Sequence, residues 1–472
     1  DHNQVYPTEI RYAFTGANPL YRMRFEYAEK TSSATSYKTQ FELATYYLLQ
    51  NVYAEESSTG SWNTARTYTL SYDSTSTAVS KLIRVQESGG GITLPVIDFE
   101  YGTSGTAIHL LTKIKNNQGS VISLEYLSST GYRDSDGGVN MIPFVVKTLH
   151  AITYSDATTG NLSRTTHDYY GGHYFVDYAN IFTREYSGFR EVVTTDFLGN
   201  VSKVYFHQSE FADDNDESSL QGEYQDHLSK KGKPYRQEVY DNAGNVYEST
   251  IRKWVHSPLP EEDRFLVVLE NETSLLWDGN ATHRDTAISY TYDAYGNVVQ
   301  EKMWGEVNAN GANGEFADSG SDSRTQSYAY IYNTQKNILA AVKEATLADA
   351  DGVVVSKERA FYDNLEWGIV TKGNLTKAEK WLNTTDEYIS TTYTYSPKGL
   401  VRTQTTPRGH TTTYSYDSFE LYPTIISNAL GHTSTLTYNY AVGDVKRVVD
   451  PNGMVQVYVY DGIGRVTSRK IS

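Results

Sequence analysis

Pairs of tyrosine and aspartate recur along this chain, and their side chains are the first candidates for chemistry. Both side chains titrate and both form hydrogen bonds, so a single pair could act as an acid-base dyad. The pairs are Tyr240-Asp241, Tyr292-Asp293, Tyr416-Asp417 and Tyr460-Asp461. A pair that repeats along a chain indicates architecture, because an active site needs one constellation and not several. We expect each ring to pack on a neighbouring hairpin and each aspartate to accept backbone N–H bonds in a turn.

Acidic loops are the second kind of candidate. Residues 213–217 offer oxygen ligands of the sort that Ca²⁺ prefers, and residues 308–318 do so more loosely. Neither segment matches the spacing of an EF-hand loop. Residues 134–137 and 349–352 are typical of turns. We therefore expect solvated acidic loops, and we assign no metal and no cofactor.

Motifs for catalysis are missing from the sequence. The histidines occur singly, and His167 and His173 lie six residues apart in a stretch rich in Tyr and Gly. There is no HExxH, no G-x-S-x-G, no Walker loop and no dinucleotide-binding glycine motif. The chain has 0 Cys, which excludes disulfides, thiolate zinc sites and a cysteine nucleophile. We expect structural histidines and no catalytic residue.

The residues around each Tyr-Asp pair define the element that must position it. After Tyr292 and Asp293 come two further residues, then Gly296 and Asn297, and then two valines. Glycine takes a positive φ at little cost, and alternation before the turn with β-branched residues after it is typical of a β-hairpin. The residues that define the repeat are Tyr240, Asp241, Gly244, Tyr292, Asp293, Gly296, Tyr460, Asp461 and Gly464, with degenerate copies at Tyr395, Gly399, Tyr416 and Asp417.

The spacing of the copies indicates how the hairpins are arranged. Two strands of ~8 residues and a turn come to roughly 20 residues, which is close to the shortest spacing, from Tyr395 to Tyr416. One hairpin cannot bury a face alone, so successive hairpins must stack edge to edge. If the ring of Tyr292 is fully buried between hairpins, its replacement by alanine should cost roughly 3–5 kcal/mol.

At this point the sequence resembles a known family. The Tyr-Asp-x-x-Gly-Asn/Arg copies resemble the YD repeats of Rhs proteins, of the B and C components of Tc insecticidal toxin complexes, and of teneurins. Residues 68–73, 80–85 and 94–101 are similar to the segment that links the SpvB-like and propeller part of Tc B components to their repeats. Residues 185–209 and 232–236 resemble the stretch that enters the repeat region. Together these stretches favour the B component.

The resemblance implies a function and partners. It implies a shell segment that houses and shields a polypeptide cargo, typically a toxin domain, inside a larger secreted or cell-surface protein of bacterial type. The implied partners are the rest of the same polypeptide or a C-type toxin component, together with the enclosed cargo. In Rhs and Tc C proteins the shell ends in a self-cleaving aspartyl segment. That signature does not occur in this sequence, so no catalytic residue is carried over.

Composition agrees with an all-β class. The chain has 41 Tyr against 15 Phe, and 35 Gly, which favours half-buried pleated surfaces joined by tight turns. The formal net charge of -16 should repel phosphate backbones, so nucleic acid is not an expected partner. No run of ~18 apolar residues occurs, so we expect no membrane insertion by this segment.

We predict an all-β fold, a strip of YD-repeat hairpins that spirals into a hollow shell and is preceded by related antiparallel β-structure. A soft boundary near Gly172 divides residues 1–172, a TcB-like middle β region, from residues 173–472, the repeat shell. Residues 339–348 have the best helix propensity of the chain and are predicted as strand or short helix.

Two alternatives come from other classes of protein. A teneurin-like or wall-associated adhesion module would display loops that bind glycans or proteins, and the aromatic and glycine cluster at residues 169–178 suits it. A polysaccharide-active β enzyme would need a cleft with paired carboxylates, and no spacing in the sequence picks out such a pair.

Overall fold

The computed structural model describes most of the chain. The described residues are 4–15, 18–37, 42–58, 61–73, 80–132, 142–156, 160, 162–176, 184–209, 222–260, 264–418, 420–439, 443–460 and 465–472.

The described part consists of β-strands with four short 3₁₀ turns. The strands of the first half are β1 (Glu9–Thr15), β2 (Asn18–Ser36), β3 (Leu43–Ser58), β4 (Ser61–Asp73), β5 (Lys81–Gly89), β6 (Ile92–Thr93), β7 (Ile97–Tyr101), β8 (Leu111–Lys115), β9 (Ser120–Ser128), β10 (Lys147–Asp156), β11 (Leu162–Val176), β12 (Arg184–Thr195), β13 (Val201–Phe206), β14 (Pro234–Tyr240) and β15 (Val246–Pro258). Those of the second half are β16 (Phe265–Leu276), β17 (Arg284–Tyr292), β18 (Val298–Ala309), β19 (Phe316–Asp318), β20 (Arg324–Asn333), β21 (Ile338–Ala348), β22 (Val354–Tyr362), β23 (Leu375–Leu382), β24 (Glu387–Tyr395), β25 (Val401–Thr405), β26 (Thr411–Tyr416), β27 (Pro423–Ser427), β28 (Thr433–Asn439), β29 (Asp444–Val449), β30 (Val455–Tyr460) and β31 (Val466–Ile471). The 3₁₀ turns are η1 (Gly105–Ala107), η2 (Ser129–Gly131), η3 (Leu228–Lys230) and η4 (Thr334–Lys336).

All strands belong to one sheet with a simple order. Apart from β6 and β19, successive strands from β1 to β31 pair antiparallel with one another. Two short strands stand beside this run: β6 pairs with β5, and β19 pairs with β18, while β5 pairs directly with β7 and β18 directly with β20. The prediction of an all-β strip of hairpins is confirmed.

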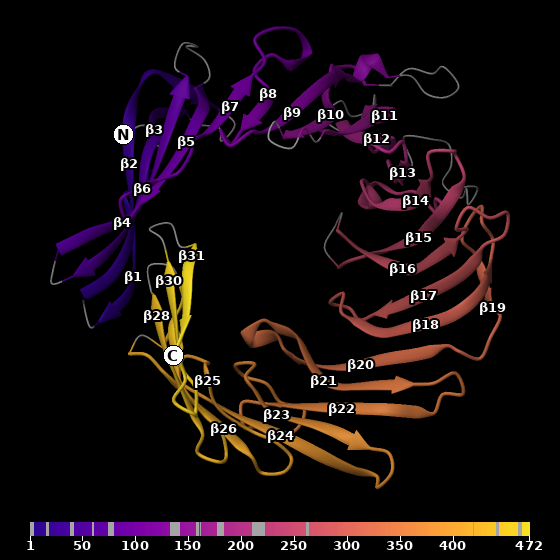
Figure 1. The fold of residues 1–472 in the computed structure, drawn as a ribbon. Helices are drawn as coiled ribbons and strands as arrows, with labels where there is room; N and C mark the ends of the chain where they lie inside the picture. Colours follow the sequence, from indigo (N-terminus) through magenta and orange to yellow (C-terminus); the bar gives the residue numbers. More distant parts are fainter. Residues whose placement is uncertain are drawn as a thin grey trace.

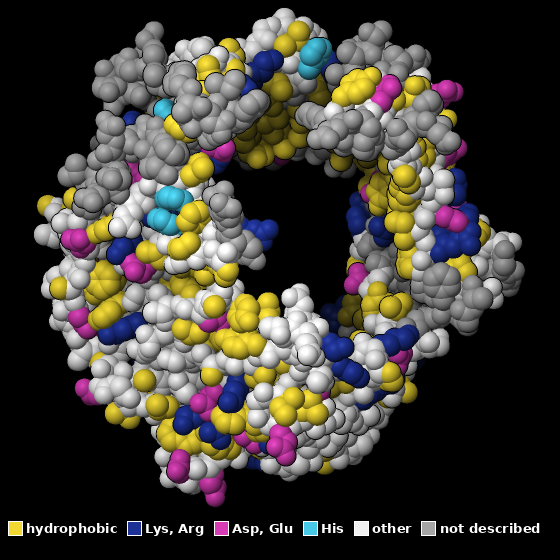
Figure 2. Space-filling model, turned by 180° about the vertical axis from the view of Figure 1, so that it is seen from behind, with side chains coloured by type: hydrophobic (Ala, Val, Ile, Leu, Met, Phe, Trp, Pro, Cys, Tyr) yellow, Lys and Arg dark blue, Asp and Glu magenta, His cyan; other side chains and the backbone are white. Residues whose placement is uncertain are grey.

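The strip curves into a ring. In Figure 1 the strands follow one another around a central opening, and the indigo strands of the N-terminal end lie near the yellow strands of the C-terminal end. Tyr21 in β2 lies close to residues from the C-terminal end of the strip. Burial raises the pKa of Tyr21 to about 12, and Asp417 and Tyr422, from the other end of the run, contribute to that rise. Figure 2 shows the opening through the middle of the molecule. The predicted hollow shell is therefore present as a ring within the described residues.

The local sequence explains why these segments form strands. In β28 exposed and half-buried residues alternate from Thr433 to Tyr438, with Ser434, Leu436 and Tyr438 on the more covered face. This period of two is the mark of a sheet that is covered on one side. Deep burial is uncommon: one cluster comprises Ile331, Ala341 and Val370, with Ile338 and Tyr362 packed against it. Backbone hydrogen bonds between strands and the packing of half-buried aromatic rings thus hold much of the sheet together.

The segment with helix propensity is a strand. Ile338–Ala348 forms β21, which pairs with β20 on one side and with β22 on the other. Pairing on both edges satisfies the backbone of this segment and outweighs the modest helix preference of its alanines. Among the described residues there is no helix long and apolar enough to cross a membrane.

The proposed division near Gly172 falls inside a strand. Gly172 lies in β11, where it pairs with Phe189 of β12, and the ladder continues on both sides of it. The division into residues 1–172 and 173–472 remains a prediction.

Candidate functional site: the repeated turns and the wall they build

The turn at Asp293 shows how each repeat is held. Asp293 Oδ1 accepts hydrogen bonds from the backbone N–H groups of Tyr295 and Asn297, at 2.8 and 2.9 Å. The other carboxylate oxygen, Oδ2, accepts from the Asn297 side-chain amide at 2.8 Å. Gly296 has φ of 83° and donates its N–H to the Asp293 carbonyl. Burial alone would raise the pKa of Asp293, but hydrogen bonds from Tyr332 and Asn297 hold it below its usual value.

The other predicted turns follow the same plan with substitutions. Asp241 accepts from Ala243 and Asn245, and Gly244 has φ of 86°. Before Gly399, with φ of 83°, the serine hydroxyl of Ser396 takes the place of the carboxylate.

The last two predicted turns are described in part. Asp417 Oδ1 accepts the backbone N–H of Leu421 at 2.9 Å. Asp461 and Gly464 lie outside the described residues, whereas Tyr460 ends β30.

A second set of turns was not singled out from the sequence. The turns that begin at Thr406, Asn428 and Asp450 have the same backbone bonds as the one at Asp293, with glycines of positive φ at Gly409 and Gly431. In this run of antiparallel strands these turns lie at the opposite edge from the turns at Asp293, Ser396 and Asp417, and at the same edge as the turn at Asp241. The spacing of Asp, Asn or Thr three residues before Gly could have revealed them, but no tyrosine precedes them.

The repeated tyrosines bind the backbone of the preceding strand. The Tyr292 hydroxyl, at the end of β17, donates to the Leu269 carbonyl of β16 at 2.9 Å. The same bond joins the following pairs: Tyr395 and Leu375, Tyr416 and Val401, Tyr460 and Val445, Tyr72 and Leu49, Tyr101 and Leu82, Tyr126 and Leu111, Tyr169 and Leu149, Tyr330 and Val298, Tyr362 and Val342, Tyr438 and Pro423. The ring of Tyr292 is half-buried and not fully buried, so the alanine cost of 3–5 kcal/mol does not apply to it.

Tyr240 departs from this pattern. Its hydroxyl donates to the Glu238 carboxylate of its own strand, at 2.6 Å. Burial, together with this hydrogen bond, raises the pKa of Tyr240. A carboxylate two residues before the tyrosine thus competes for the hydroxyl.

A β-bulge accompanies each predicted tyrosine. Thr291 pairs with Gln300, but Tyr292 pairs with Val298, so Val299 is an extra residue in the outgoing strand. Register shifts occur in the same way at Tyr240, Tyr395, Tyr416 and Tyr460. The hairpins between them, β25 with β26, β27 with β28 and β29 with β30, have no shift. The bulges at Tyr292, Tyr395, Tyr416 and Tyr460 lie at one edge of the strip, and the bulge at Tyr240 lies at the other. Bulges increase twist and bend a strand, so the strip bends at each of these repeats.

Replacing Tyr292 by phenylalanine should remove the bond to the Leu269 carbonyl and leave the ring in place. We expect the free energy of unfolding to fall by about 1 kcal/mol, the net contribution of one such bond. Urea denaturation followed by tyrosine fluorescence measures it. Tyr154→Phe, on an exposed ring, is the matched control. Equal midpoints for Tyr292→Phe and the unaltered protein would show that water replaces the bond without loss.

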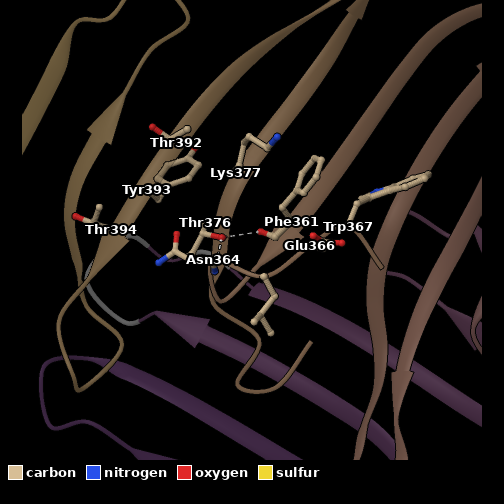
Figure 3. A pocket seen from close by; sticks show the side chains of 10 residues that line it. Phe361, Asn364, Glu366, Trp367, Thr376, Lys377, Thr392, Tyr393 and Thr394 are labelled. Atoms are coloured by element: carbon tan, nitrogen blue, oxygen red, sulfur yellow. Dashed lines mark hydrogen bonds between the residues drawn. The ribbon is translucent and has the colours of Figure 1, made fainter. Parts of the chain in front are cut away.

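A pocket of 620 Å³ lies where β22, β23 and β24 meet the loop of residues 363–374 (Figure 3). Phe361, Trp367 and Tyr393 line it, and the Lys377 ammonium lies 3.6 Å from the centre of the Phe361 ring. The carboxylate among its lining residues is that of Glu366, whereas glycoside hydrolysis needs two. The pocket does not supply the paired carboxylates of the enzyme alternative.

The loop beside this pocket is organised by one carboxylate. Asp363 accepts backbone hydrogen bonds from Thr371, Lys372, Gly373 and Asn374, at 2.7, 2.7, 3.2 and 3.0 Å, and a further bond from the Thr371 hydroxyl. Burial would raise the pKa of Asp363, but these backbone bonds outweigh it and lower the pKa to about 2. A single side chain thereby closes the loop of residues 363–374 between β22 and β23.

The other sequence candidates are occupied by ordinary contacts. In the loop at 308–318, Asn310 and Asn313 accept backbone N–H groups two residues on, and Glu315 accepts the Tyr224 hydroxyl. His167 contacts the Thr194 hydroxyl, and burial lowers the pKa of its ring.

The aromatic and glycine cluster falls within the wall as far as it is described. Tyr169 packs on Tyr132 and Phe189, and its hydroxyl bonds to the Leu149 carbonyl. Residues 134–137, 177–178 and 213–217 lie outside the described part of the chain. A histidine that the sequence did not single out, His207, is buried beside two carboxylates.

A ring of hairpins joined by Tyr-Asp turns is the architecture of a YD-repeat shell protein. Residues 395–433 match the family model for the RHS Repeat, and residues 92–210 match the model described as Insecticide toxin TcdB middle/N-terminal region. These matches and the fold confirm the resemblance to Rhs-repeat proteins and to Tc toxin B components. No curated protein sequence matches the chain.

Solved structures support the same fold. The crystal structure of TcdB2-TccC3-TEV matches with a TM-score of 0.76 at 10% identity, covering 98% of this chain and 45% of that one. TcdB2-TccC3 matches with a TM-score of 0.62 at 13% identity, covering 97% and 32%. The Photorhabdus luminescens Tc holotoxin pore matches with a TM-score of 0.61 at 12% identity, covering 93% and 28%. The chain therefore spans less than half the length of these structures.

Proposed function

We propose that this chain is a non-catalytic wall segment of a Tc-type toxin shell that houses and shields a polypeptide cargo. The observation that carries the proposal is the hollow ring made from one continuous sheet (Figure 1). The matched structures are of TcdB2-TccC3 and of a Tc holotoxin pore, which supports a role inside a multi-component toxin. On this proposal the protein is secreted as part of such a complex.

Containment follows from the construction of the wall. Within the described run, the strands between β1 and β31, apart from the short β6 and β19, are hydrogen-bonded on both sides, so a protease loop meets paired backbone along this part of the wall. The hydrogen bonds of the tyrosine hydroxyls join each hairpin to the strand before it, next to the bulges at which the strands bend. The hydrogen-bonded backbone of the sheet, and not mobile side chains, would separate an enclosed cargo from proteases outside the shell.

The partner proposed for this wall is a C-type component or the rest of the same polypeptide. β31 bonds to β30 on one side, and no strand within the described residues pairs with its other edge. Val466 and Ile471 on that strand are exposed at 55% and 56%. An unpaired strand edge is a template for another strand, so the next hairpin of the shell is proposed to continue the sheet there.

Protease protection tests the proposal. The full-length protein is prepared with its C-type partner and its enclosed polypeptide, and the rate of cargo digestion is compared with that of the same polypeptide alone. We expect digestion at least tenfold slower in the complex, because the wall excludes the protease.

Variants at the meeting of the two ends sharpen this test. The double substitution Tyr21→Ala with Tyr422→Ala removes rings that approach each other there, and it should restore part of the digestion. Tyr154→Ala, on an exposed ring of β10, is the control and should leave protection unchanged. Digestion of the cargo at the same rate inside and outside the complex would contradict encapsulation. Binding to a glycan array that is lost on replacement of Trp367 would favour the adhesion alternative.

A further inference from the structure

His207, Glu223 and Asp226 form a buried group of metal-ligand type. His207 follows β13, and the two carboxylates precede η3. His207 Nδ1 lies 3.0 Å from Asp226 Oδ1 and 3.6 Å from Glu223 Oε1. One ligand atom from each residue lies within 4.8 Å of the others. The three residues are exposed at 0%, 8% and 4% respectively, so solvent contributes little to their neutralisation.

Second contacts fix the carboxylate of Asp226. Its Oδ2 accepts the backbone N–H groups of Gln208 and Ser209, at 3.1 and 2.7 Å, which leaves Oδ1 directed to His207. Such outer contacts are what orient ligands in known metal sites. On its other side the His207 ring packs on Tyr235, with 5.2 Å between ring centres. The chain thus presents one oxygen and one ring nitrogen in a set geometry.

A buried lysine lies beside this group. Lys230 is the neighbouring cation, and it too is buried, but its ammonium donates to the backbone carbonyls of Tyr224 and Gln225 at 2.6 and 2.7 Å. Burial lowers the pKa of Lys230 to about 8. His207 Nε2 has no hydrogen-bond partner within the described part of the chain. No contact at Nε2 therefore selects one tautomer of the ring.

We propose that His207, Glu223 and Asp226 bind a divalent zinc-type metal ion. Zn²⁺ binds imidazole nitrogen and carboxylate oxygen at about 2.0–2.2 Å in tetrahedral geometry, which places neighbouring ligand atoms about 3.4 Å apart. The observed separations of 3.0 and 3.6 Å from His207 Nδ1 bracket that value. One neutral imidazole and two carboxylates match the charge of the ion, and water completes the fourth position.

The ion would take the place of the contact between His207 Nδ1 and Asp226 Oδ1. As a ligand His207 must be a neutral imidazole that offers Nδ1 and carries its proton on Nε2. The ion would join the end of β13 to the segment before η3, two parts of the wall nineteen residues apart. This site is independent of the cargo and of the partner.

The test uses the full chain, stripped with a chelator and titrated with Zn²⁺ alone. We expect one equivalent to bind and to raise the unfolding midpoint, with Ca²⁺ giving no rise. Co²⁺ in place of zinc should give the intense visible absorption of a tetrahedral site. His207→Gln and Asp226→Asn should each weaken binding at least tenfold.

Matched variants separate this site from adventitious binding. His283→Gln alters a histidine that is paired with one carboxylate, Asp285, and it should leave zinc affinity unchanged. If His207→Gln does not fold, Glu223→Gln removes a ligand and keeps the His207 to Asp226 contact, and it should still weaken binding. Absence of a tight equivalent, or equal affinity in Glu223→Gln and the unaltered chain, would overturn the proposal and leave a metal-free His-Asp pair.

Discussion

Tyr235→Ala should lower the free energy of unfolding by about 3–5 kcal/mol, the range for removing a fully buried aromatic ring. Tyr235, in β14, is 1% exposed and is among the largest fully buried side chains of the described structure. Its ring packs on those of His207 and Tyr205, so alanine leaves a cavity bounded by rings that cannot collapse into it. Chemical denaturation gives the global value, and hydrogen exchange of β13 to β15 gives the local one.

The control for this prediction is Tyr154→Ala. Tyr154 lies in another strand of the same sheet and is 52% exposed, so its loss should change stability by less than about 0.5 kcal/mol. Similar losses for both variants would show that ring removal acts through strand propensity and not through burial. In a wall where each strand contacts its neighbours, the loss is expected to be centred on β13 to β15.

Asp363→Ala should release the loop of residues 363–374. Four backbone N–H groups and one hydroxyl lose their acceptor, and we expect a loss of about 2–3 kcal/mol, since water replaces part of these bonds at an exposed site. Amide exchange of Thr371 to Asn374 should rise by at least tenfold, because closed-loop protection depends on that carboxylate. Asp351→Ala, on an exposed turn residue, is the control.

The same carboxylate gives a pH dependence with a fixed sign. The folded pKa of Asp363 is lowered to about 2, below the value of an unfolded aspartate, so its contribution is present above pH ~4 and is lost as the pH falls through about 2. After solvent screening this contribution is on the order of 1 kcal/mol. Loop amide exchange should therefore increase between pH 4 and pH 2 in the unaltered chain more than in Asp363→Ala. Equal acid responses in both would assign the effect to other groups.

Local chemistry made much of this fold predictable. The order of Asp, two residues and Gly after an alternating run predicts a hairpin, and at Asp293 and Asp241 the carboxylates and glycines take the geometry of such a turn. Residues 339–348 were ambiguous because alanine and leucine suit a helix, and the choice is made by pairing with β20 and β22, which no local window contains.

Longer-range features were out of reach for the same reason. The acceptor of the Tyr292 hydroxyl is a backbone carbonyl, and carbonyls carry no sequence signal, so the bond from Tyr292 to Leu269 could not be read from residue types. The approach of Tyr21 to Tyr422 depends on the curvature summed over the whole strip. His207 and Asp226 meet across nineteen residues at no motif spacing.

The bulge beside the turn of each repeat makes the size of the ring a property of strand number. Neighbouring strands lie about 4.8 Å apart, so the single run from β1 to β31, without its two side strands, gives a perimeter of about 135 Å and a diameter on the order of 43 Å. Because each hairpin pairs with its neighbours and contributes its own bend, adding one hairpin would lengthen the perimeter by about 10 Å and leave the other turns unaltered. Interior capacity could therefore change by duplication of a unit of roughly twenty residues, without redesign of a core.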